Sequence, residues 1–138
     1  MSFEELFDAS YERVLQSSPE FPDFFEAFYR RFLMSSPEVR ALFRNTDMAV
    51  QRSMLKKSFF SLVAFYASGN VDDVLHRIAC LHSARHLGIK PHLYDLWLDC
   101  LTDTVRTYDW ECSDDIELAW RLVLSPGITY MKFSYDHF

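Results

Sequence analysis

The stretch that decides the fold is VDDVLHRIACLHSARHLGIKP, residues Val71–Pro91. Its first half places apolar residues three or four positions apart, at Val71, Val74, Leu75 and Ile78. This period predicts a helix with one buried face. Gly88 can end that helix, and Pro91 can open the next one because its φ already suits a first turn.

His82 lies four residues after Ile78 and continues the apolar face of this helix by one turn. An imidazole nitrogen at the end of an apolar face is either a metal ligand in a dry pocket or an ordinary core or surface histidine. His86 follows four residues later, a spacing compatible with two ligands on one metal. The residues between them, Ser83-Ala84-Arg85, lack the glutamate of the HExxH zinc motif. His76 faces another side of the helix, so the three histidines form no cluster.

The composition favours helices over strands. The 138 residues suggest one domain, residues 1–138, and aromatic side chains make up 17% of it. The chain has only 3 glycines and 5 prolines, whereas a fold rich in hairpins needs turn glycines. We therefore expect an all-α fold.

The net charge, the N-terminal residues and the cysteines limit which binding partners and which cellular compartment are expected. A net charge of −6 argues against nucleic acid or an anionic membrane surface as the main partner. The first residues, MSFEELFDAS, lack the basic and apolar regions of a signal peptide, and no apolar run approaches the roughly 18 residues of a membrane span. We expect a cytoplasmic protein. Cys80, Cys100 and Cys112 form no CxxC motif and are expected to be free thiols.

Seven helices, one of them short, account for the chain. The patterns of apolar residues, caps and breakers place them at about 2–16, 22–34, 36–43, 47–66, from 71 toward Gly88, 91–107, and from 113 or 114 onward. Asn70 is expected to cap the fifth helix. At Pro126 we expect a kink or a stop and restart, because proline removes a backbone donor and clashes with the preceding turn.

Two helices carry unusual residues on their predicted faces. The second helix has more aromatic residues than one buried stripe needs: Phe21, Phe24, Phe25, Phe28, Tyr29 and Phe32. This helix is either central and covered on several sides, or it lines a pocket for a flat ligand. In the fourth helix, the amide of Gln51 shares a face with Leu55 and Phe59. A buried amide needs a hydrogen-bond partner, unless it reaches water near the helix end.

Three segments in order carry a resemblance to a known family. They are Phe28-Tyr29-Arg30-Arg31-Phe32, Ser36-Pro37-Glu38-Val39-Arg40-Ala41-Leu42-Phe43 and Gln51-Arg52-Ser53-Met54-Leu55. Their order and spacing resemble the globin domain of bacterial flavohaemoglobins and related single-domain bacterial globins. Gly88-Ile89-Lys90-Pro91-His92-Leu93-Tyr94 resembles the segment that follows the proximal histidine there. The resemblance covers roughly residues 21–108 and implies a globin-like fold, about seven helices around a haem pocket.

The resemblance also implies a non-covalently bound b-type haem and a role for individual residues. His82 binds the iron on the proximal side, with His86 as the second candidate, and Tyr94 lies beside His82. Tyr29 and Gln51 face the distal side, where a bound gas is held. The remaining haem-contacting residues are Phe43, Leu55 and Ile89. Two departures accompany this match: the gap from His82 to Gly88 is longer than usual, and the family's glutamate partner of the proximal pair has no clear counterpart.

The implied function is reversible binding of O₂ or another diatomic gas, NO or CO, for storage, oxygen transport, scavenging or sensing. A phenol O–H and an amide N–H both suit this role, because each can donate to the partial negative charge on bound O₂. One alternative is a nitric oxide dioxygenase, which needs an external reductase as partner because no reductase segment is found here. A haem-free regulatory globin is the other alternative.

Overall fold

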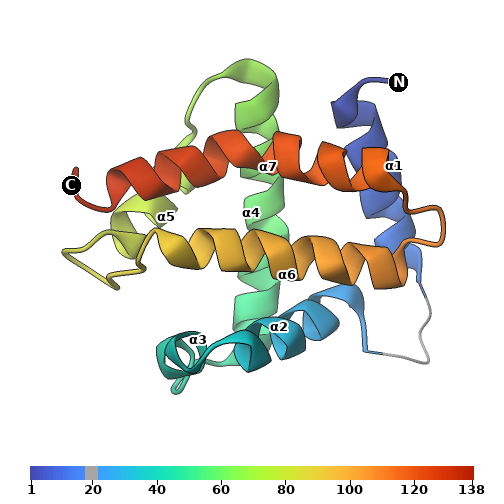
Figure 1. Ribbon diagram of the computed structural model, residues 1–138. Helices are drawn as coiled ribbons and strands as arrows, with labels where there is room; N and C mark the ends of the chain where they lie inside the picture. The colour runs from blue at the N-terminus through green and yellow to red at the C-terminus, as the bar shows by residue number, and fades with distance from the viewer. Residues whose placement is uncertain (18–21) are drawn as a thin grey trace.

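The computed structural model describes residues 1–17 and 22–138 (Figure 1). This part of the chain contains α-helices and no strand, which confirms the all-α prediction. The helices are α1 (Phe3–Gln16), α2 (Phe24–Ser35), α3 (Pro37–Leu42), α4 (Met48–Ser68), α5 (Asp73–His82), α6 (His92–Tyr108) and α7 (Asp114–Ser134). All seven predicted helices are therefore present, with boundaries shifted by a few residues.

The helix starts follow the side-chain caps. Ser2 caps α1: it accepts a hydrogen bond from the Glu5 N–H at 3.1 Å, and its hydroxyl donates to the Glu5 carboxylate at 3.2 Å. The predicted cap of α5 is wrong. Asp72, not Asn70, is the N-cap, because its carboxylate accepts from the Leu75 N–H at 2.7 Å. The helix therefore begins two residues later than an Asn70 cap would place it.

Helix α7 runs unbroken through Pro126, so the predicted stop and restart is wrong. Both halves of the helix bury apolar side chains, among them Val123 before the proline and Ile128 after it. This burial outweighs the one backbone hydrogen bond that proline removes. Gly127 is buried where Leu62 of α4 packs directly against its Cα, so α4 and α7 approach closely there.

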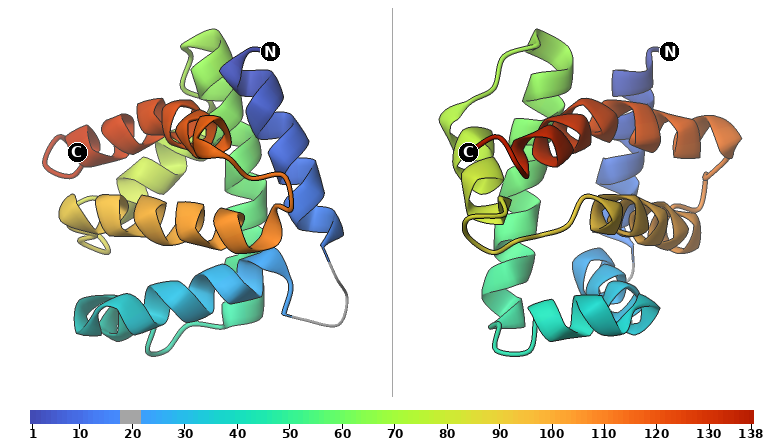
Figure 2. Two further views of the ribbon diagram at one scale, coloured as in Figure 1. Left: turned by 45° about the vertical axis from the view of Figure 1, so that its right-hand side comes forward. Right: turned by 60° about the vertical axis from the view of Figure 1, so that its left-hand side comes forward.

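The helices cross in layers rather than forming a parallel bundle. Helices α6 and α7 lie antiparallel and side by side, and both cross α4 at a steep angle (Figure 1). Helix α2 lies along the other side of α6, and α1 packs against α7 (Figure 2). The short α5 lies near the C-terminal end of α7 and the start of α6. This arrangement places the end of α5 opposite the region where α2, α3 and α4 meet.

An aromatic cluster around Trp120 of α7 forms the centre of the core. Its fully buried indole lies 4.5 Å from Phe7, 5.8 Å from Phe24 and 6.1 Å from Phe59, measured between ring centroids. These rings come from α1, α2 and α4, so one residue joins four helices. Aromatic pairs at these separations stabilise by about 0.5–1.5 kcal/mol beyond their burial.

Some residues predicted to be buried lie at the edge of the fold instead. Phe3 and Leu15 of α1 are 36% and 44% exposed, because the middle of that helix alone reaches the core. Val71 and Val74 before and in α5 are also exposed, whereas Leu75 is buried. The predicted aromatic position Phe21 lies outside the described residues.

A buried polar network fixes α1 against the end of α6. The Asp109 carboxylate accepts from the Ser10 hydroxyl at 2.6 Å and from the Arg13 guanidinium at 2.6 and 2.9 Å. Ser10 in turn accepts from the Trp120 indole N–H at 2.9 Å. Burial raises the pKa of Asp109, but the hydrogen bonds from Arg13 and Ser10 outweigh it and hold that pKa below its ordinary value.

We predict that Asp109→Ala lowers the free energy of unfolding by about 2–4 kcal/mol, because Ser10 and Arg13 lose their acceptor in a dry site. Urea unfolding at neutral pH measures the loss. Asp8→Ala, an exposed carboxylate on α1, is the matched control and should change stability by less than about 0.5 kcal/mol.

The Asp109 contribution is also pH-dependent. Its pKa is lower in the folded state, so the stabilisation is present above the unfolded value of 3.8 and is lost as the pH falls through the folded pKa. The free energies of unfolding of wild type and Asp109→Ala should therefore converge in strong acid. A difference between these two free energies that stays constant down to the lowest pH would contradict this account.

Candidate functional site

His82 is the last residue of α5 and is half-buried beside the start of α6. Its Nδ1 lies 3.0 Å from the hydroxyl oxygen of Tyr94, a buried residue in the first turn of α6. The turn between the two helices returns to His82, because the Ile89 N–H donates to the His82 carbonyl at 3.0 Å. Gly88 adopts φ +65° in that turn, a conformation that favours glycine. The local chain thus brings His82, Ile89 and Tyr94 together.

Burial sets the protonation of this pair. It lowers the pKa of His82 to about 4 and raises the pKa of Tyr94, so both groups are neutral near pH 7. No hydrogen bond to Nε2 of His82 is found among residues 1–17 and 22–138, in which every fully buried side-chain nitrogen and oxygen has a partner. Nε2 is therefore accessible. A neutral imidazole oriented through Nδ1, with Nε2 accessible, is the form in which histidine binds a metal.

A second polar pair comes from α2 and α4. The Gln51 side-chain amide donates to the Tyr29 hydroxyl at 3.2 Å, so the amide has the partner that its apolar surroundings require. Burial raises the pKa of Tyr29 to about 12, against smaller opposing effects of Gln51 and Arg52. The phenol keeps its proton near pH 7. Because Gln51 occupies the oxygen as a donor, the Tyr29 O–H remains available to donate to another acceptor.

Apolar residues surround this second pair. The Phe43 ring at the C-cap of α3 meets Tyr29 edge-on, with centroids 5.7 Å apart, and also contacts Phe32. Leu55 is buried one helical turn after Gln51 on α4. Phe43, Tyr29, Gln51 and Leu55 therefore occupy the corner formed by α2, α3 and α4.

The other histidines lie apart from this site. His86 is exposed in the turn after α5, whereas His82 is half-buried and bonded to Tyr94. His76 contacts the hydroxyl of Tyr130 on α7 through Nδ1 at 3.3 Å. The described part of the chain holds no group of three or more His, Cys, Asp or Glu side chains suited to a metal ion. Any metal at His82 would need ligands from elsewhere, as a porphyrin supplies them.

The chemistry of these residues fits a haem, and His82 is paired with a neutral group. Among the described residues, no carboxylate hydrogen-bonds to His82 or Tyr94. The imidazole is therefore oriented by a neutral phenol, and its electron donation is expected to be weaker than with an ionised partner.

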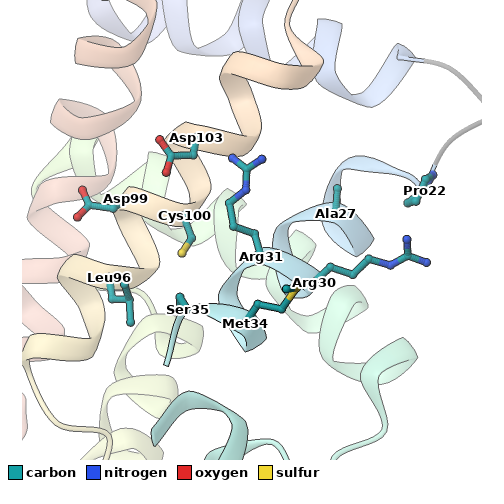
Figure 3. Close-up of a pocket in the computed structure, with 10 residues that line it drawn as sticks. All are labelled: Pro22, Ala27, Arg30, Arg31, Met34, Ser35, Leu96, Asp99, Cys100 and Asp103. Carbon is teal, nitrogen blue, oxygen red and sulfur yellow. The ribbon is translucent and has the colours of Figure 1, made fainter. Parts of the chain in front are cut away.

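A separate surface groove of about 600 Å³ lies between α2 and α6 (Figure 3). Arg30 and Arg31 line it on the α2 side, and Asp99 and Asp103 line it on the α6 side, with Cys100 between them. None of the predicted site residues lines this groove. No sequence pattern predicted this groove, because its walls come from helices far apart along the chain.

None of the helices in the described ranges is both long enough and apolar enough to cross a lipid bilayer.

We predict that His82 makes the stability of the haem-free protein depend on pH. The unfolded chain takes up a proton near the ordinary pKa of 6.5, whereas buried His82 stays neutral until about pH 4. The stabilisation is present above 6.5 and is lost as the pH falls from 6.5 to about 4. Urea unfolding measured across this pH window should show that the free energy of unfolding falls more steeply with falling pH in wild type than in His82→Gln.

The matched control is His86→Gln, because His86 is exposed. Its free energy of unfolding should depend on pH as steeply as that of wild type. An equally steep dependence in wild type and His82→Gln would show that burial does not shift the protonation of His82.

Comparison with known proteins connects this site with a family. No protein-family model matches the chain, and no curated protein matches it. Among solved structures it is similar to a protein from Pseudomonas aeruginosa PAO1, with 37% sequence identity and a TM-score of 0.89. The match covers 97% of this chain and 98% of that chain. That protein is described as structurally highly homologous to a human haemoglobin.

This likeness extends over nearly the whole chain and includes the arrangement of its helices, so the predicted globin-like fold is confirmed. The finer resemblance to the globin domain of flavohaemoglobins stays a prediction, as do the roles of the individual site residues. The chain belongs to the globin family.

Proposed function

We propose that this globin binds b-type haem through Nε2 of His82 and holds O₂ or another diatomic gas beside Tyr29 and Gln51. The observation that carries the proposal is the half-buried, neutral His82, oriented by Tyr94 and accessible at Nε2. Haem iron, when bound, supplies a coordination position for a gas molecule. The rest of the chemistry comes from the protein side chains.

On the proximal side, Tyr94 holds the imidazole in one tautomer. If Nε2 binds the iron, Nδ1 carries the proton and donates to the Tyr94 oxygen. The ring is then oriented by a partner on a separate helix. The absence of a carboxylate from this pair within the described residues supports reversible gas binding over chemistry that depends on strong electron donation from the proximal side.

On the distal side, the Tyr29–Gln51 pair supplies donors in a dry setting. The Tyr29 O–H is free to donate because its oxygen already accepts from Gln51. Bound O₂ carries partial negative charge, so such a donor stabilises it and slows its release. Phe43 and Leu55 give this corner an apolar wall, which strengthens the interaction by excluding water.

We predict that purified protein reconstituted with haem gives a sharp Soret band that shifts when the reduced form binds CO. The measurement is an absorption spectrum of the ferric, dithionite-reduced and CO-bound forms. His82→Ala should lose the histidine-ligated spectrum, whereas His86→Ala should retain it. Failure of wild type to take up stoichiometric haem would refute gas binding at haem and favour the haem-free regulatory alternative.

We further predict that Tyr29→Phe increases the O₂ dissociation rate by about tenfold, since losing one hydrogen bond of about 1.5 kcal/mol has that effect. Stopped-flow displacement of O₂ by CO measures the rate. Tyr108→Phe is the matched control, because its hydroxyl bonds to the Pro22 carbonyl outside the site. An unchanged rate in Tyr29→Phe would remove Tyr29 from the distal site.

A further inference from the structure

The short helix that ends in His82 is held from outside by the end of α7. Two side-chain contacts join His76 of α5 to this region. Its Nδ1 lies 3.3 Å from the Tyr130 hydroxyl, and its ring lies 5.3 Å from the Phe138 ring, tilted by 59°. His76 is six residues before His82, so these contacts restrain α5 ahead of the candidate ligand.

A backbone contact restrains the chain on the other side of His82. The Ala84 N–H donates to the Tyr135 carbonyl at 2.8 Å, just after α7 ends. Ala84 lies two residues beyond His82. The segment that follows α7 therefore holds the first turn after the helix as well as the helix itself.

A fourth contact reaches the neighbour of Tyr94, the partner of the imidazole. Lys132 of α7 pairs with Asp95 of α6 at 2.6 Å, and Asp95 is the neighbour of Tyr94. Both side chains are partly exposed, so this ion pair alone contributes little. Its position matters more than its strength, because it joins the start of α6 to the same stretch of chain that holds α5.

The four contacts bracket the His82–Tyr94 pair, and none of them touches the His82 imidazole. Figures 1 and 2 show the end of the chain beside α5 from each side. We propose that Tyr130, Lys132, Tyr135 and Phe138, all within residues 130–138, form a clamp that positions His82 for the iron; this role rests on haem ligation by His82, as proposed above. Tyr130, Tyr135 and Phe138 are accordingly positioning residues, and the accessible Nε2 is left for the metal.

The test uses three full-length variants at one end of the molecule. Phe138→Ala removes the ring that meets His76, and Phe138→Tyr keeps a ring there. Phe133→Ala is the matched control, because Phe133 is exposed and its ring stacks on His137 and not on His76. The first measurement is the amide hydrogen exchange rate of Ala84 and of α5 in haem-free protein, by NMR.

Phe138→Ala should speed exchange at Ala84 and α5 by about three- to tenfold, the range expected for losing one aromatic contact. Phe138→Tyr should restore protection, and Phe133→Ala should match wild type. Amides of α4 should be unaffected in every variant, which separates a local loosening from global unfolding. Equal exchange in Phe138→Ala and wild type would overturn the clamp.

The second measurement is haem-dependent. The rate of haem loss to an excess of an unrelated apoglobin, and the width of the iron–histidine Raman band of the reduced form, should both rise in Phe138→Ala only. If α5 exchanges faster but these two readouts do not move, the segment is merely structural and the positioning role is wrong. If wild type binds no haem, the proposed function fails, and the exchange comparison still decides whether residues 130–138 restrain α5.

Discussion

The hydrogen bond from the Trp120 indole to Ser10 is the interaction on which the rest of the fold depends. A fully buried indole contributes a large apolar surface, yet its N–H needs an acceptor. The Ser10 hydroxyl is that acceptor, and it donates its own hydrogen bond to the Asp109 carboxylate. The Arg13 guanidinium balances the charge of Asp109. This one chain of contacts joins α7, α1 and the end of α6. With these helices fixed, α4 can pack against α7 at the Gly127 contact with Leu62.

The same burial that stabilises the core sets the chemistry of the candidate site. Removing His82 from water favours its neutral form, and removing Tyr29 and Tyr94 from water keeps their phenol protons in place. The two polar pairs are therefore neutral near pH 7, and each is internally hydrogen-bonded. Such pairs suit an uncharged gas and a flat apolar cofactor better than hydrolysis, which commonly uses an ionised base or nucleophile.

Much of the fold and of the candidate site could be predicted from the sequence, because the relevant signals are local. The apolar period located the helices, and the stripe through Ile78 singled out His82 over His86. The Asp72 cap could not be predicted, and at Pro126 the sequence left both a kink and a stop and restart open. Which of several nearby polar residues caps a helix depends on backbone geometry, and whether proline interrupts a helix depends on what the two halves bury.

By itself, the sequence determined the helical class, the approximate ends of the helices, and which polar residues interrupt apolar helix faces. Spacing along a helix fixes which side chains share a face, so His82 and Gln51 could be recognised as exceptions on apolar faces. Only the tertiary structure decided the partners. The Tyr29–Gln51 and His82–Tyr94 bonds, and the contact of Ala84 with Tyr135, each join separate elements. Such distances depend on how whole helices cross, which no local pattern encodes.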